Sequence, residues 1–375
     1  MTAPILVVEI RSQSGYRADA MRRPPLSRPL PSPVRPRRAS LRKAAALLGT
    51  LVGCEASDAP VVNVYSHRHY DADQLLFDRF QELTGIEVRV VTATADELIT
   101  RLEREGAASP ADVLITVDAG RLHRAKERGL LRPVTSPVLS EAIPANLRDP
   151  EGYWFGLTQR ARILVYAPDR VSAEELSTYE NLADPSWEGR VLVRSSDNIY
   201  NQSLLASIVA ADGPEVAEAW ARGVVENLAR PPQGADTDLV LDVASGIGDV
   251  AIVNTYYFGR LLRDPDPAVR ELAETVRVFF PNQNDRGAHV NVSGAGVTAS
   301  APNPENAVRL LEFLVSEEAQ RVFAEVIFEY PVRADVPWAP TLTEWGEFRA
   351  DTLNLRRLGE LNAEAVMIFD RAGWR

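Results

Sequence analysis

The 375-residue chain has few of the residues that most metal and redox sites use. It contains one cysteine, Cys54, and four histidines. A single cysteine cannot form an intrachain disulfide and is too few for a thiolate metal site. Zinc or copper sites would call for more histidine or cysteine than this. Basic residues are also outnumbered, 41 against 52 acidic ones, giving a net charge of −11. We therefore expect no nucleic-acid groove, because phosphate binding needs clustered Lys and Arg.

The charge is unevenly distributed between a basic start and an acidic remainder. Residues 1–53 carry a net charge of +8, and the remaining residues carry −19. Overall the chain is 45% hydrophobic and 25% charged, which is typical of globular proteins with substantial cores. Its length predicts two domains.

The basic start has the anatomy of an export signal. Residues 35–43 are rich in Arg and Lys, and residues 44–53 form an uncharged run that is too short to span a bilayer. Leu-Val-Gly-Cys at 51–54 resembles a bacterial lipobox, in which the cysteine becomes the lipid-carrying first residue of the mature protein. We predict that residues 1–59 are an export signal, lipobox and tether. The alternative is an Arg- and Pro-rich tail with an incidental cysteine.

Two details of this segment stay open. Residues 37–42 resemble a twin-arginine export signal, with Ser40 where a phenylalanine is more usual, so export follows either that route or the Sec route. Met21 is an alternative start to Met1. A lipid at Cys54 would anchor a periplasmic protein to the membrane.

After residue 60, short apolar strands alternate with amphipathic helices. The pattern predicts strands at 61–65, 86–90, 113–117, 156–166, 191–194, 250–253 and 290–299, and helices at 71–84, 96–105, 120–128, 203–211, 214–226, 306–315 and 317–327. This rhythm indicates an α/β protein with doubly wound sheets. We expect one domain at 60–157 plus 282–375, a second at 158–281, and a crossing strand at 156–166. His123, among charged residues, is expected on a solvent-exposed helix face.

Three polar turns that contain tyrosine follow three of the predicted strands. They are Ser-His-Arg-His-Tyr-Asp at 66–71, Ser-Ser-Asp-Asn-Ile-Tyr-Asn at 195–201 and Asn-Thr-Tyr-Tyr-Phe-Gly-Arg at 254–260. Ligands of open α/β sheets bind beyond the carboxyl ends of the strands. Adjacent tyrosines are usually structural, but three such turns in equivalent places indicate a binding site.

Clustered tyrosines favour a hard, strongly acidic metal ion. Tyrosine titrates near pH 10, so at neutral pH it loses its proton only beside a strong Lewis acid. Ferric iron is the available biological ion with that character. Three phenolates balance its charge and a fourth leaves −1, which Arg160 and Arg260 would stabilise if they lie close.

At these motifs the chain resembles the ferric-iron-binding proteins of bacterial ABC importers, the branch best known from cyanobacteria. The resemblance covers about residues 60–375. Besides the tyrosine turns it includes Gln-Arg-Ala-Arg at 159–162, Tyr-Glu-Asn-Leu-Ala-Asp-Pro at 179–185 and Asn-Leu-Arg-Arg-Leu-Gly-Glu-Leu-Asn at 354–362. It implies a two-domain periplasmic-binding-protein fold of type II that closes on the ion about hinge strands.

The resemblance also implies the site and the partners. The metal ligands would be the tyrosines of the three turns, with an optional fifth ligand from the first turn: Tyr70, Tyr200, Tyr256, Tyr257 and His69. Arg160 and Arg260 would be neighbouring charges outside the ligand set. The protein would bind Fe(3+) as a periplasmic monomer and deliver it to an inner-membrane permease with its ATPase.

Two other functions remain open from the sequence. A solute-binding protein for a small anionic or organic ligand would keep this fold and use Ser66, Arg68, Ser195, Ser196 and helix N-termini. An iron-tyrosinate enzyme would need an open coordination position and a substrate pocket. No nucleophile–base pair or metallohydrolase motif is present, so we expect no enzymatic activity.

Overall fold

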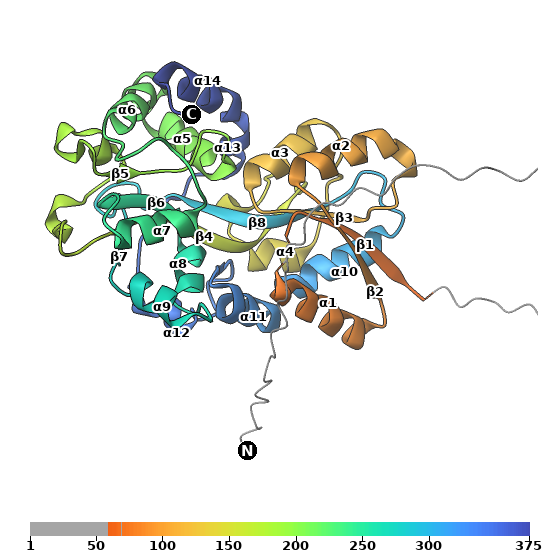
Figure 1. Ribbon diagram of the computed structural model, residues 1–375. Coiled ribbons are helices and arrows are strands. Elements are labelled where there is room, and N and C mark those ends of the chain that lie inside the picture. Colours follow the sequence, from red (N-terminus) through yellow and green to blue (C-terminus); the bar gives the residue numbers. More distant parts are fainter. Residues whose placement is uncertain (1–58, 69) are drawn as a thin grey trace, which may run out of the picture. The chain divides into compact units, whose positions relative to one another are not determined.

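Two long strands run through the middle of the described part of the chain and connect its two halves (Figure 1). They are β4 (Phe155–Tyr166) and β8 (Val290–Val297). The computed structural model describes residues 59–68 and 70–375. The predicted export signal with Cys54, and the candidate ligand His69, lie outside the described residues.

Nine strands form a mixed sheet in this part of the chain. The other strands are β1 (Val61–Ser66), β2 (Glu87–Thr92), β3 (Val113–Thr116), β5 (Val191–Leu192), β6 (Val250–Asn254), β7 (Arg277–Phe279) and β9 (Tyr330–Pro331). The order is β2-β1-β3-β8-β4-β6-β5, with β7 and β9 also paired to β4. Strand β1 runs parallel to β2 and β3, β5 runs parallel to β6, and β8 and β4 pair antiparallel with their neighbours.

Strand β4 crosses from one half of the sheet to the other, as the sequence predicts. Its residues 155–161 pair with β8, whereas residues 162–166 pair with β6. Strands β3 and β6 are buried along their whole length, because helices cover both faces of each half. Figure 1 shows α2 and α3 on one side of the β1–β3 end and α1 and α10 on the other. This is the doubly wound arrangement that continuous apolar strands indicate.

The predicted helices are present, and several short ones were not predicted. The helices are α1 (Asp71–Thr84), α2 (Ala95–Glu105), α3 (Ala119–Glu127), α4 (Pro137–Ala142), α5 (Ile199–Asp212), α6 (Pro214–Glu226), α7 (Asp236–Ala244), α8 (Thr255–Leu261), α9 (Pro267–Ala273), α10 (Pro304–Leu314), α11 (Glu317–Ile327), α12 (Pro340–Glu344), α13 (Arg356–Glu360) and α14 (Asn362–Ala372). Helix α1 ends where Gly85 adopts φ +70°, a conformation that favours glycine. Within the described ranges, no helix combines the length and the apolar character that crossing a bilayer would require.

The C-terminal helices, which were grouped with residues 60–157 in the prediction, also contact elements of the second predicted domain. Helix α14 packs against α5 and α6, which lie in the range assigned to the second domain. Its buried face is an apolar stripe that includes Ile368 and Phe369, and Trp374 contacts Trp220 of α6 with ring centres 5.8 Å apart. Helix α13 packs against both α3 and α5. The tail therefore contacts elements from both predicted domains, and the domain boundaries stay a prediction.

Candidate metal centre

All three tyrosine segments follow strands and lie at the N-terminal ends of helices. Tyr70 is the residue before α1, Tyr200 is in the first turn of α5, and Tyr256 and Tyr257 are in the first turn of α8. The sequence analysis predicted turns, not helices, for the second and third tyrosine segments, 195–201 and 254–260. Helix α5 instead starts at Ile199, before the predicted 203. The positive ends of three helix dipoles therefore face this region, which stabilises negative charge there.

The four tyrosine rings form one cluster. The hydroxyl oxygens of Tyr200 and Tyr256 are 3.1 Å apart. The ring centres of Tyr70 and Tyr256 are 6.4 Å apart, and those of Tyr256 and Tyr257 are 4.2 Å apart. Metal–oxygen bonds of roughly 2.0–2.2 Å, as in zinc carboxylate sites, separate neighbouring ligand oxygens by about 3 Å. The Tyr200–Tyr256 distance therefore suits two ligands of one ion.

Both arginines named from the sequence lie beside the tyrosine rings. The guanidinium carbon of Arg260 is 4.7 Å from the ring centre of Tyr70 and 5.2 Å from that of Tyr256. The guanidinium carbon of Arg160 is 5.2 Å from the ring centre of Tyr200. Arg160 is buried, and its Nε and Nη1 have no hydrogen-bond partner among the described residues. Buried donors usually have acceptors, so this guanidinium favours a negative charge in its neighbourhood.

Burial favours the neutral form of the Tyr70, Tyr200 and Tyr256 phenols. Burial, together with Glu329, raises the pKa of Tyr70 to about 12, although Arg68 and Arg260 oppose the shift. Burial raises the pKa of Tyr200 and Tyr256 well above the ordinary value, and the neighbouring tyrosines add to the shift. Removing a proton from these groups therefore needs a strong positive charge inside the cluster.

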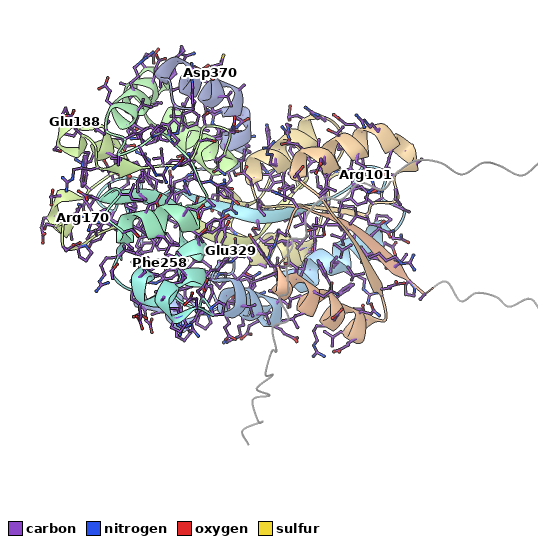
Figure 2. All side chains as sticks on the ribbon, viewed as in Figure 1. Arg101, Arg170, Glu188, Phe258, Glu329 and Asp370 are labelled. Carbon is purple, nitrogen blue, oxygen red and sulfur yellow. The ribbon has the colours of Figure 1, made fainter. Side chains whose placement is uncertain are left out.

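Two buried groups near Tyr70 were not predicted as part of the metal site, although Arg68 was named for the alternative anion-binding function. Arg68 is 2% exposed, pairs with Asp73 at 2.8 Å and lies 5.2 Å from the ring centre of Tyr70. Glu329 is 1% exposed, accepts hydrogen bonds from Thr158 and Ser293, and has a buried Oε1 without a partner among the described residues. Figure 2 shows Glu329 near the middle of the described unit. Arg68 belongs to a tyrosine motif, whereas no pattern in the sequence marks Glu329.

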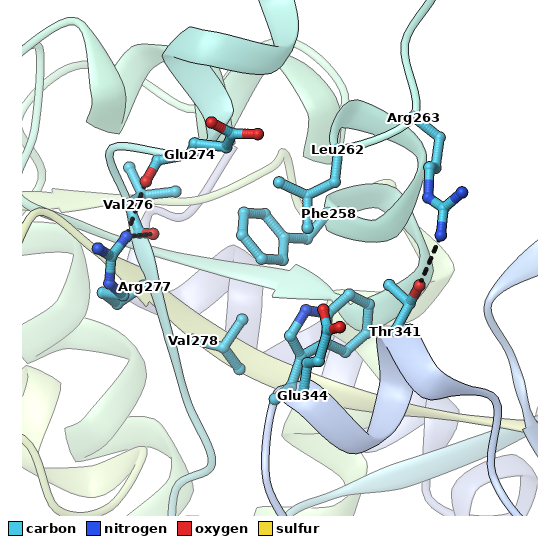
Figure 3. A pocket seen from close by; sticks show the side chains of 10 residues that line it. Phe258, Leu262, Arg263, Glu274, Val276, Arg277, Val278, Thr341 and Glu344 are labelled. Atoms are coloured by element: carbon cyan, nitrogen blue, oxygen red, sulfur yellow. Dashed lines mark hydrogen bonds between the residues drawn. The ribbon is translucent and has the colours of Figure 1, made fainter.

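A cavity of about 460 Å³ lies behind α8 and does not include the tyrosines (Figure 3). Phe258, Leu262 and Trp345 line it, and Arg263 at its rim donates to Thr341. Its walls belong to α8, α12 and β7. None of the four tyrosines is among the residues that line this cavity.

Comparisons with known proteins show the family of this chain. Residues 108–350 match the family model described as bacterial extracellular solute-binding protein. The chain is 52% identical over 330 residues to iron uptake protein A1 of Synechocystis, which covers 86% of this chain and 92% of that protein. This chain belongs to the bacterial extracellular solute-binding proteins. The major ferric iron-binding protein of Neisseria meningitidis serogroup B is a more distant relative, 28% identical over 319 residues, 84% of this chain and 93% of that protein.

Solved structures of this family share the fold. The Trichodesmium FutA protein, determined with iron and citrate, is 51% identical and superimposes with a TM-score of 0.82 over 84% of this chain and all of that chain. The ferric binding protein of Campylobacter jejuni is 42% identical, with a TM-score of 0.80 over 84% of this chain and all of that chain. The solute-binding protein described here therefore has the type II periplasmic-binding fold that the family resemblance implies.

Proposed function

We propose that this protein binds ferric iron outside the cytoplasm through tyrosine phenolates and delivers it to an ABC importer. The ligands are Tyr70, Tyr200, Tyr256 and Tyr257, and His69 is an optional fifth. The observation that carries the proposal is the convergence of four tyrosines from three strand–helix junctions, with two hydroxyl oxygens 3.1 Å apart. The names of the relatives, which include iron uptake and ferric iron-binding proteins, support the choice of metal.

The charges around the cluster support a set of anionic ligands. Five guanidinium carbons lie 4.7–6.0 Å from the centre of a tyrosine ring, and they belong to Arg68, Arg160, Arg162, Arg194 and Arg260. Cations at this distance stabilise phenolates over phenols. A trivalent ion with four phenolates carries a net charge of −1, which such surroundings stabilise. Arg160 and Arg260 are the charges we assign to this task.

The mature protein is expected to turn coloured on loading with ferric iron. Phenolate-to-iron charge transfer absorbs visible light, and one iron per chain is expected by metal analysis after equilibration with ferric citrate. Protein that stays colourless and iron-free under these conditions would contradict the proposal. A binder of small anions, which would use Ser66, Arg68, Ser195 and Ser196, would bind without colour, and an iron-tyrosinate enzyme would change its colour when substrate is added.

Delivery requires that the ion be held between parts that can separate. Tyr70 comes from the β1–α1 junction, and the other three tyrosines come from the β5–α5 and β6–α8 junctions, with β4 and β8 between them. A metal bound to all four would hold these junctions together. We propose that closing about β4 and β8 presents a surface to the permease, and that the protein acts as a monomer.

Replacing Cys54 by serine is expected to move the protein from the membrane fraction to the soluble periplasm, or to stall its processing. The reason is the proposed lipid at Cys54, which would hold the receptor near its permease and raise its effective concentration there. Several acyl chains on one cysteine would hold stably, whereas one holds weakly. Fractionation of wild type and Cys54→Ser measures this. Two identical soluble proteins would mean that the segment is an ordinary cleaved signal.

A further inference from the structure

A buried ion pair joins the two helices that carry three of the four tyrosines. Asp236, at the start of α7, is fully buried and pairs with Arg162 of β4, with Arg162 Nη1 2.8 Å from Asp236 Oδ2. The same carboxylate oxygen accepts the backbone N–H of Asn254 at 2.7 Å. Asn254 precedes α8 and lies two residues before Tyr256. The carboxylate therefore fixes the start of the helix that carries Tyr256 and Tyr257.

The other arm of the guanidinium reaches the second tyrosine helix. Arg162 Nη2 donates to Asn201 Oδ1 at 2.8 Å, and Asn201 follows Tyr200 directly in α5. The Asn201 amide in turn donates to the carbonyl oxygen of Arg194 at 2.8 Å. Arg194 Nη1 returns to Asp236 Oδ1 at 3.3 Å. Four residues thus form a closed ring of contacts beside Tyr200, whose ring centre lies 6.0 Å from the guanidinium carbon of Arg162 and 5.9 Å from that of Arg194.

We propose that Asp236 and Arg162 are positioning residues that set the distance between the Tyr200 and Tyr256 hydroxyl oxygens, and hence the strength and geometry of iron binding. This inference rests on the proposed function. The guanidinium of Arg162 is planar and presents its N–H donors at fixed geometry. One guanidinium can therefore fix the positions of the Asp236 carboxylate and the Asn201 amide relative to each other. Partners that orient metal ligands typically account for roughly 10- to 100-fold in metal affinity.

Another aspartate in the same half of the sheet provides a matched control. Asp249 also bridges two arginines, accepting from Arg170 Nε at 2.8 Å and from Arg190 Nε at 2.7 Å. It precedes the first residue of β6, whereas Asn254 is the last residue of that strand. At about 3.3 Å per strand residue, the two ion pairs lie roughly 16 Å apart along β6. Removing the charge of Asp249 therefore breaks an ion pair in the same half of the sheet, far from the residues that contact the tyrosine helices.

Asp236→Asn is expected to weaken iron binding by roughly 10- to 100-fold and to shift the phenolate-to-iron absorption band. Asn201→Ala, which leaves every charge in place, is expected to shift the same band and to weaken binding. Asp249→Asn is expected to lower the melting temperature of the protein while leaving the band and the affinity at wild-type values. Competition against a chelator, visible spectra and thermal melts measure the three quantities.

The outcomes separate this inference from the proposed function. A wild-type protein without the absorption band would overturn iron–tyrosinate binding itself. A wild-type band that neither Asp236→Asn nor Asn201→Ala shifts would overturn only the positioning role. Losses of affinity that merely follow the melting temperature across all three variants, with the band unmoved, would also overturn it. If Asp236→Asn does not fold, Asn201→Ala decides, since it keeps the buried ion pair intact.

Discussion

Changing Tyr200, Tyr256 and Tyr257 together to phenylalanine is expected to abolish ferric iron binding at concentrations that saturate the wild type. Each change removes one anionic ligand oxygen and keeps the aromatic ring that packs in the cluster. Residues that only orient a metal ligand account for roughly 10- to 100-fold in affinity, so each ligand oxygen is expected to cost more than that. Chelator competition, followed by the visible band, measures the loss for the triple variant and for each single variant.

A matched control uses a tyrosine outside the cluster. Tyr153 is half-buried, and the ammonium of Lys126 lies 4.8 Å from its ring centre. Tyr153→Phe removes the same hydroxyl chemistry elsewhere and is expected to leave iron affinity and colour unchanged. Thermal melts without iron should show all variants folded. A triple variant that binds iron like the parent would show that the ligands are assigned to the wrong residues.

Iron binding is expected to weaken steeply as the pH falls, because protons and metal compete for the phenol oxygens. The sign follows from the pKa values: burial raises the pKa of Tyr70 to about 12, and it raises the pKa of Tyr200 and of Tyr256 well above the usual value for tyrosine. These groups are therefore protonated throughout the physiological range, and each must release a proton when it binds iron. With three or four phenolates, apparent affinity should fall by roughly 1,000- to 10,000-fold per pH unit.

Potentiometric titration of the iron-free protein with a ferric chelate of known proton balance measures this release directly. The expected stoichiometry is between three and four protons per iron at neutral pH. A site built from imidazole or carboxylate would release few protons above pH 7, because those groups titrate near 6.5 and 4. Loading without proton release would contradict phenolate ligation. Tyr153→Phe should release the same number of protons as the wild type.

The positions of the tyrosines at strand ends were predictable, and so was helix α1 after Tyr70. The helical turns that carry Tyr200, Tyr256 and Tyr257 were not predicted. Apolar runs mark β1 and β6 clearly, and the polar residues after them mark the edge of the sheet. Helix α8 contains Thr, two Tyr, Phe and Gly in seven residues, which are weak helix formers. A Cβ at Gly259 would lie 2.7 Å from the ring of Phe328, so close packing against Phe328 requires glycine here. No local sequence pattern predicts this contact between Gly259 and Phe328.

Long-range contacts account for the other differences between the sequence expectations and the structure. His123 has charged neighbours and was expected on a solvent-exposed face, yet it is 9% exposed. That expectation is wrong because α13 covers it, and a Cβ at Gly359 would lie 2.5 Å from His123. Asp236 forms its ion pair with Arg162, which is 74 residues away in the sequence. Periodicity carries no information about partners at that separation, so the ring of contacts beside Tyr200 could be found only in the folded chain.

The spread of the tyrosines along the chain has a consequence for when a metal can be captured. The cluster combines position 70 with positions 200, 256 and 257, so no short stretch of the nascent polypeptide holds more than two of them in sequence. Assembling it requires contacts between distant segments, which form late in folding. A chain that crosses the membrane unfolded therefore meets its first metal in the outer compartment, whereas a chain exported folded meets cytosolic metals first. Under the proposed function, the compartment in which the chain folds would therefore decide which metal ions the four tyrosines meet first.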